Sequence, residues 1–104
     1  MKNILYIDTS DSLVTLVRLT AMGQTAELKE SSKIRRSQSV LVLVEKLLRA
    51  SNLTIQDITQ IEVFAGPGSF TGLRVGVSVA NTLATLLEIP INGKINSPVV
   101  PIYA

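Results

Sequence analysis

Between an apolar, strand-like run and a long helical pattern lies the segment Gly66-Pro67-Gly68-Ser69-Phe70-Thr71-Gly72. Its glycines permit a tight turn and a close approach of the backbone to a neighbouring group. Residues 61–65 (IEVFA) have the composition of a buried strand, and residues 70–87 that of a helix that Ser69 can cap. The segment therefore predicts a strand–turn–helix unit.

The same segment has a functional interpretation, because free N–H groups at the start of a helix can hold an anion. It is not a P-loop, since no Gly-Lys-Ser/Thr follows, and its glycines do not have the spacing of the dinucleotide-binding fingerprint. Two interpretations stay open: a tight turn capped by Ser69, or a degenerate phosphate site that uses Gly66, Gly68 and Ser69.

A second candidate element ends the first predicted strand, residues 3–8 (NILYID). There Asp8 and Thr9 begin a run of acids and hydroxyls, which is where actin-like and sugar-kinase-like ATPases hold metal and phosphate. Such loops normally place glycine beside the aspartate, whereas no glycine lies between Ile4 and Met22. Asp8 and Thr9 form either a capped β-turn or part of the degenerate phosphate site.

The periodicity of the whole chain predicts an α/β lobe with the order β-β-β-α-β-α-β. Residues 13–20 and 25–30 predict a hairpin, residues 38–51 a first helix, and residues 91–95 a last strand. We expect a mixed five-stranded sheet, in which an antiparallel meander of three strands is extended in parallel beside the first strand. Both helices should pack on one face, and the other face should be apolar and poor in helices.

Small residues form a ridge on the second helix, where Gly72, Gly76 and Ala80 are spaced by four. Glycine in a helix costs ~1 kcal/mol relative to alanine, so close packing should compensate for it. The ridge could pack against a partner helix or against the lobe's own sheet. The pattern alone leaves both alternatives open.

The first helix carries an apolar residue that a single buried face does not explain. On a helical wheel Val42 falls opposite the apolar stripe, close to the charged residues of the helix. The wheel alone does not say what would cover Val42.

Composition restricts the chemistry further. The chain has 104 residues, 46% of them hydrophobic, with no cysteine and no histidine. This excludes a disulfide framework, a Cys/His zinc site and a Ser-His-Asp triad. We find no apolar run of ~18 residues and no signal-peptide pattern, so we expect a cytoplasmic chain with no membrane span, metal or cofactor. The net charge is only +2, and the cluster Lys33, Arg35 and Arg36 is its one candidate RNA contact.

Three blocks in register resemble the TsaB (YeaZ) family: residues 4–10 (ILYIDTS), 37–38 (SQ) and 66–76 (GPGSFTGLRVG). The similarity continues through residues 89–91. It implies a ribonuclease-H-like lobe of the actin-like ATPase superfamily. We expect residues 1–104 to form that single lobe, without the second lobe of the family.

The resemblance also implies a function: a non-catalytic scaffold subunit of the machinery that makes N6-threonylcarbamoyladenosine in tRNA. It implies pairing with a TsaD-like subunit through a helical bundle. There we expect Gly72, Gly76 and Ala80 to form the close-contact ridge and Val42, Leu43 and Lys46 the outward face of the first helix. It also implies cooperation with a TsaE-like ATPase, and contact with tRNA only through the complex. A second copy could occupy the same surface, giving a homodimer. The family is sometimes called glycoprotease-like, but we find no catalytic constellation here. Two alternatives remain: an ATP-binding phosphotransfer lobe that uses Asp8 and the 66–72 loop, and a small RNA-binding module.

Overall fold

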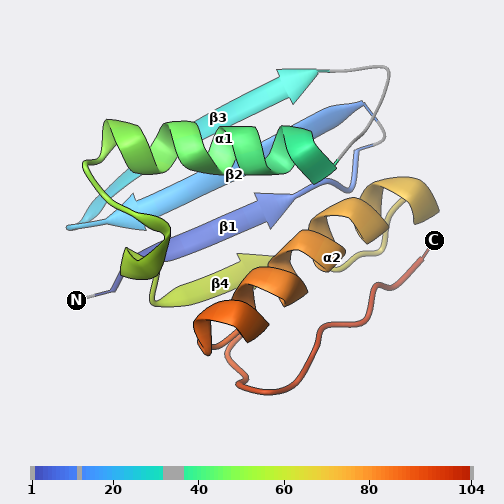
Figure 1. Ribbon diagram of the computed structural model, residues 1–104. Helices are drawn as coiled ribbons and strands as arrows, with labels where there is room; N and C mark the ends of the chain where they lie inside the picture. Colours follow the sequence, from blue (N-terminus) through green and yellow to red (C-terminus); the bar gives the residue numbers. More distant parts are fainter. Residues whose placement is uncertain (1, 12, 32–36, 104) are drawn as a thin grey trace.

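The computed structural model describes residues 2–11, 13–31 and 37–103 (Figure 1). One sheet carries both helices on the same face, and the C-terminal segment runs back beside the second helix. The elements, in chain order, are β1 (Ile4–Asp8), β2 (Val14–Ala21), β3 (Gln24–Ser31), α1 (Ser37–Ala50), the 3-10 turn η1 (Ile55–Asp57), β4 (Gln60–Val63) and α2 (Phe70–Leu87).

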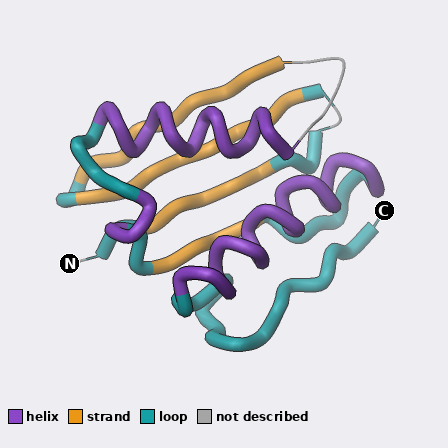
Figure 2. Tube along the Cα trace, viewed as in Figure 1, coloured by secondary structure: helices purple, strands orange, loops and turns teal. Residues whose placement is uncertain are grey.

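The sheet has the strand order β3-β2-β1-β4 (Figure 2). Strands β1, β2 and β3 form an antiparallel meander, with Leu5 opposite Leu19 and Leu19 opposite Ala26. Strand β4 lies parallel to β1, with Ile61 opposite Leu5. The predicted α/β class, the hairpin and the parallel fourth strand are confirmed.

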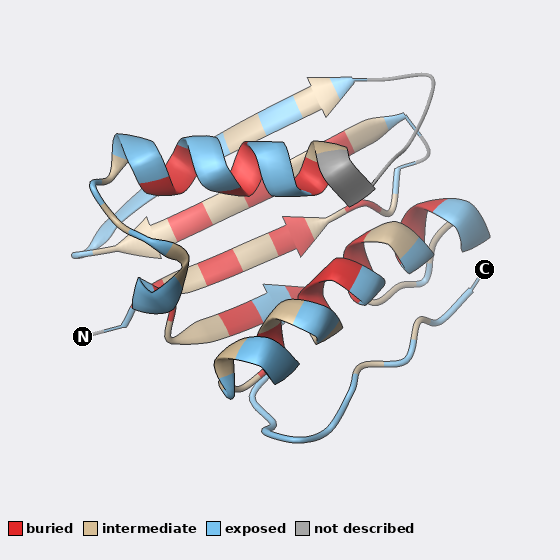
Figure 3. Cartoon of the chain, viewed as in Figure 1, coloured by how far each residue is buried: buried red, intermediate tan, exposed pale blue. Residues whose placement is uncertain are grey.

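The hydrophobic core fills the space between the sheet and the two helices. In β1 every second side chain is buried, as expected for a strand with one covered face. Helix α1 buries one side and exposes the other (Figure 3). The largest fully buried side chains come from strands and helices alike and include Leu5, Ile7, Val17, Leu19, Val40, Val44, Ile61 and Leu73.

Both helices lie where the sequence predicts them. Helix α2 has the predicted range, and α1 is displaced by one residue from the predicted 38–51. Ser69 caps α2, since its side chain accepts a hydrogen bond from the Gly72 N–H at 3.1 Å. At the other end Glu88 adopts the left-handed conformation, and its N–H bonds to carbonyls of the last turn.

The predicted fifth strand at residues 91–95 is wrong. In this segment Ile91 forms an isolated parallel bridge with Ile61. The next two residues, Asn92 and Gly93, have positive φ angles of 48° and 83°, which turn the chain away from the sheet. The sheet described here therefore has four strands and not five.

The Asn92 side chain makes hydrogen bonds to β4 at the position where a fifth strand would have bonded it. The Asn92 side-chain amide accepts a hydrogen bond from the Val63 N–H at 2.8 Å and donates to the Val63 carbonyl at 3.1 Å. Further along the same edge, the Ile102 N–H donates to the Ala65 carbonyl at 2.6 Å. The backbone groups of the outer edge thus receive partners without a regular strand.

The face of the sheet opposite the helices is mixed, because a polar stripe lies beside the apolar residues Ile4 and Leu16; the expectation of an apolar face holds only in part. Arg18 lies with its guanidinium carbon 5.0 Å from the centre of the Tyr6 ring, and its Nη2 is 2.8 Å from Glu27 Oε1. The Tyr6 hydroxyl donates to the Asp8 carboxylate at 3.4 Å. Burial, and next the negative charge of Asp8, raise the pKa of Tyr6 above its ordinary value of 10.0.

Candidate docking surface

The junction between β1 and α2 is organised around Thr9, which is almost completely buried. Its hydroxyl donates to the Gly72 carbonyl and accepts a hydrogen bond from the Gly76 N–H at 2.9 Å. The hydroxyl thereby joins the end of the first strand to the first two turns of α2. The Thr9 hydroxyl therefore makes both of its hydrogen bonds within the lobe.

The ridge of small residues faces this junction and not a partner. A Cβ at Gly72 would lie under 3.0 Å from the Thr9 carbonyl oxygen, and a Cβ at Gly76 equally close to the Thr9 hydroxyl oxygen. Ala80 is fully buried on the same helix. Our assignment of Gly72, Gly76 and Ala80 to a partner interface is therefore wrong, because the sheet of the same lobe already covers them.

The residues of the predicted phosphate site do come together in space. Gly68 lies against Ser10, since a Cβ at Gly68 would be 3.1 Å from the Ser10 Cβ. Ser10 in turn donates to the Asp8 carboxylate through its N–H at 2.9 Å and its hydroxyl at 2.7 Å. Ser69 caps α2, and the Ile102 carbonyl lies against Gly66. The polar groups that would have to bind a phosphate, namely the Asp8 carboxylate and the Gly72 N–H at the start of α2, are thus hydrogen-bonded to Ser10 and Ser69 of the same lobe.

The remaining sequence-predicted sites add little chemistry. Among the residues that the structure describes, no group of three or more acidic, cysteine or histidine side chains is arranged to hold a metal ion. The basic cluster Lys33, Arg35 and Arg36 lies outside the described residues.

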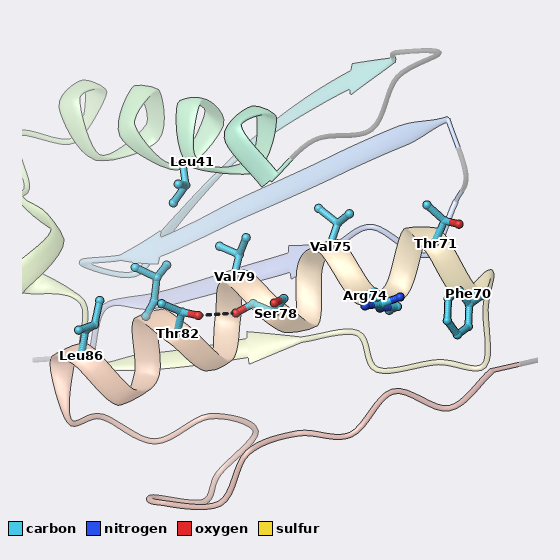
Figure 4. Close-up of a pocket in the computed structure, with 10 residues that line it drawn as sticks. Leu41, Phe70, Thr71, Arg74, Val75, Ser78, Val79, Thr82 and Leu86 are labelled. Atoms are coloured by element: carbon cyan, nitrogen blue, oxygen red, sulfur yellow. Dashed lines mark hydrogen bonds between the residues drawn. The ribbon is translucent and has the colours of Figure 1, made fainter.

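A groove of about 630 Å³ runs between α1 and α2 (Figure 4). Leu41 points into it from α1, and Val75 and Val79 point toward α1 from α2. The large apolar side chains around it are exposed: Leu41 to 45%, Phe70 to 54% and Leu86 to 74%. We call this the interhelical groove; it is lined by Leu41, Phe70, Thr71, Arg74, Val75, Ser78, Val79, Thr82, Leu83 and Leu86.

The α2 side of the groove also carries two small hydroxyl residues, Ser78 and Thr82. Ser78 and Thr82 lie one turn apart, and the Thr82 hydroxyl donates back to the Ser78 carbonyl at 2.9 Å (Figure 4). Arg74 is the one charged side chain among the described residues that line the groove. Its guanidinium carbon lies 5.0 Å from the centre of the Phe70 ring. The groove is therefore lined mainly by apolar side chains, with small hydroxyl residues among them and one positive charge near the start of α2.

The α1 residues predicted for the interface divide into two groups. Val42 and Lys46 are exposed, whereas Leu43 is buried in the core. A second hollow, of about 360 Å³, lies between α1 and the segment that follows it (residues 53–55), and Leu41 lines both hollows. Leu41 is thus a central residue of this surface, and our sequence analysis did not assign it to the interface.

Helix α2 is apolar on more than the face that it packs on the sheet. By length and composition alone it could cross a membrane, yet it belongs to the core of the lobe, with 39% of its residues buried. The other residues include Phe70, Val75 and Leu86 on the groove side. An apolar helix with two apolar faces is typical of a helix that is covered on both. This excess of apolar residues is the signal in the sequence from which the groove could have been predicted.

A family model described as TsaD, tRNA N6-adenosine threonylcarbamoyltransferase, matches residues 30–99, which include both helices and β4. The chain belongs to this family. Its resemblance to the TsaB (YeaZ) members is also confirmed by individual relatives. The tRNA threonylcarbamoyladenosine biosynthesis protein TsaB of Bacillus subtilis is 39% identical over 89 residues, which are 86% of this chain and 39% of that protein.

Two further comparisons agree with this assignment. YeaZ from Pseudomonas aeruginosa has a solved structure that superimposes with a TM-score of 0.81 at 30% identity, over 88% of this chain and 42% of that one. The tRNA N6-adenosine threonylcarbamoyltransferase of Listeria monocytogenes is 34% identical over 56 residues, 54% of this chain and 16% of that protein. The chain spans about two fifths of the length of its TsaB and YeaZ relatives.

Proposed function

We propose that this lobe is a non-catalytic scaffold in the biosynthesis of threonylcarbamoyladenosine in tRNA, and that it pairs with a TsaD-like subunit through the interhelical groove. The observation that carries the proposal is the exposure of Leu41, Phe70 and Leu86 around one groove between two helices. Exposed apolar side chains gathered in a continuous surface are typical of protein–protein contacts. In this proposal the lobe acts in the cytoplasm and meets tRNA and a TsaE-like ATPase only within the complex.

The nature of the partner follows from the lining of the groove. The small side chains of Ser78 and Thr82 leave room for a helix to approach α2 closely, and the exposed Leu41, Phe70 and Leu86 would be buried against its apolar side. Arg74 favours an acidic residue on the partner near the start of α2. A TsaD-like subunit is supported as the occupant because the chain belongs to the TsaD family and has TsaB relatives. A second copy of the chain would compete for the same groove.

The scaffold role is supported by the polar groups of the β1–α2 junction, which hydrogen-bond to one another. Thr9 joins β1 to α2, and Asp8 accepts hydrogen bonds from its own turn. The strand order, with a meander followed by a parallel strand beside β1, fits the ribonuclease-H-like lobe that we propose as its ancestry. The lobe would then contribute a surface, while the partner contributes the chemistry.

The experiment is a calorimetric titration of the chain with the TsaD-family protein of the same organism. Leu86→Ala should weaken binding about tenfold, since truncating an interface residue that contributes strongly to binding costs more than about 1 kcal/mol. Leu13→Ala is the matched control, because Leu13 is a leucine that is 54% exposed and does not line the groove. Equal affinity of wild type and Leu86→Ala would place the partner elsewhere.

A further inference from the structure

The C-terminal segment runs back beside α2 toward the start of that helix (Figure 1). Near the middle, the Asn81 side chain donates to the Val99 carbonyl at 2.9 Å and accepts from the Val99 N–H at 2.8 Å. Further on, the Ile102 N–H donates to the Ala65 carbonyl at 2.6 Å. We call residues 97–103 the C-terminal strap.

The strap approaches the glycine segment so closely that only glycine fits there. The Ile102 carbonyl lies against Gly66, where a Cβ would be under 3.0 Å from its oxygen. Gly66 has a φ of 117°, a conformation that other residues rarely adopt. Next to it, Gly68 forms a parallel bridge with Tyr103. The end of the strap is therefore fixed in position against the residues that lead into α2.

This position brings the Tyr103 ring onto Phe70, the first residue of α2. The two ring centres lie 4.6 Å apart with an angle of 39° between the planes. The Arg74 guanidinium also lies over the Phe70 ring. Phe70 and Arg74 both line the interhelical groove, whereas Tyr103 does not. A residue outside the groove thus contacts the aromatic side chain at one end of it.

We propose that the C-terminal strap holds this end of the interhelical groove in the conformation that binds the partner, with Tyr103 as a positioning residue for Phe70; the inference rests on the function proposed above. Phe70 is half exposed in the first turn of a helix, so its ring needs a neighbour to stay in one rotamer. A side chain ordered before association does not have to be ordered during it, and affinity rises accordingly. Any change that lifts the strap would then weaken docking without touching the interface.

The strap offers a matched control three residues before Tyr103. Val100 is 76% exposed and does not line the groove, so Val100→Ala shortens an apolar side chain of the strap without altering the aromatic contact. Tyr103→Ala removes the ring. Tyr103→Phe keeps the ring and should restore binding, whereas a role of the hydroxyl would leave it impaired.

The test is a titration of these three variants, and of Leu86→Ala, with the TsaD-family protein of the same organism. Tyr103→Ala should weaken binding about three- to tenfold, the range expected for one side chain that must be ordered on association. Tyr103→Phe and Val100→Ala should bind like wild type. Thermal melts of all four variants accompany the titrations.

The outcomes separate this inference from the proposed function. Weakening by Leu86→Ala but not by Tyr103→Ala overturns the strap and leaves the groove as the interface. No weakening by Leu86→Ala overturns the proposed function and the strap with it. If Tyr103→Ala fails to fold, magnetic resonance on wild type decides: Overhauser contacts between the Phe70 and Tyr103 rings support the strap, and their absence overturns it.

Discussion

The Thr9 hydroxyl oxygen accepts a hydrogen bond from the Gly76 N–H at 2.9 Å, inside the junction of β1 and α2. A Cβ at position 76 would lie under 3.0 Å from that oxygen, a distance that real Cβ atoms essentially never show. The hydrogen bond and the glycine therefore depend on each other. Since Thr9 also donates to the Gly72 carbonyl, this one side chain sets how closely α2 approaches the sheet.

The first prediction is that Gly76→Ala destabilises the folded chain by about 1–3 kcal/mol, the usual cost of overpacking a filled core. A loss of stability is informative here, because alanine in place of glycine normally stabilises a helix by ~1 kcal/mol. Urea denaturation monitored by circular dichroism measures the difference. Ser78→Ala, at an exposed position on the opposite side of α2 from the ridge, is the control and should change stability little.

A double-mutant cycle with Thr9→Ala tests the cause. Removing the hydroxyl makes room for a Cβ at position 76, so the double variant should lose less stability than the sum of the single variants. A Gly76→Ala chain as stable as wild type but altered in oligomeric state would contradict this account. That result would return the ridge to an interface between subunits.

The second prediction concerns Asn92, whose side-chain amide bonds both backbone groups of Val63. Asn92→Gly keeps a residue that tolerates the positive φ but removes the amide, and should cost about 1–3 kcal/mol of unfolding free energy. Asn96 also has a positive φ, of 55°, so Asn96→Gly is the matched control. Equal effects of the two substitutions on urea denaturation would show that the amide contributes nothing.

The helices were predictable from the sequence because their signals are local. Ser69 caps α2, and the turn at Glu88 and Pro90 ends it, so the predicted and observed bounds agree. The fifth strand was not predictable in the same way. Its apolar residues fit a strand, but the Asn92 amide makes its hydrogen bonds to β4, which lies 29 residues away in the chain.

The orientation of the glycine ridge shows a second limit of sequence reasoning. Periodicity showed that Gly72, Gly76 and Ala80 share one side of α2, but not whether the sheet or a partner lies on that side. The outcome depended on Thr9, far away in the sequence, whose hydroxyl occupies the space beside Gly76. Once the ridge is known to face inward, the apolar residues on the other side of α2 become the candidate interface.

The third prediction concerns pH. Burial and the nearby Asp8 raise the pKa of Tyr6, so the folded chain keeps the phenol proton at pH values where the unfolded chain has lost it. The stabilisation is complete below pH 10 and is lost as the pH rises through the raised pKa of the folded state. The free energy of unfolding should therefore fall more steeply above pH 10 in wild type than in Tyr6→Phe.

Absorbance of tyrosinate measures this directly in a Tyr103→Phe background, which leaves Tyr6 as the one tyrosine of the chain. The midpoint should lie above the ordinary value of 10.0. Asp8→Asn should lower the midpoint, because it removes the negative charge beside the phenol. A midpoint at or below the ordinary value would show that Tyr6 is solvated in the folded chain.

The last prediction is that the chain neither binds nor hydrolyses ATP with Mg²⁺ at a measurable level. In a nucleotide site, Asp8 would face the metal and the start of α2 would face phosphate. Here the Asp8 carboxylate accepts two hydrogen bonds from Ser10, and the Gly72 N–H donates to the Ser69 cap. A phosphate would have to break these hydrogen bonds before it could make its own. Calorimetric titration with ATP and Mg²⁺ should show no saturable heat, and phosphate release should equal that of a heat-killed sample. Turnover that disappears in Asp8→Ala but persists in Asp11→Ala, an exposed acid of the same turn, would instead establish a phosphotransfer lobe.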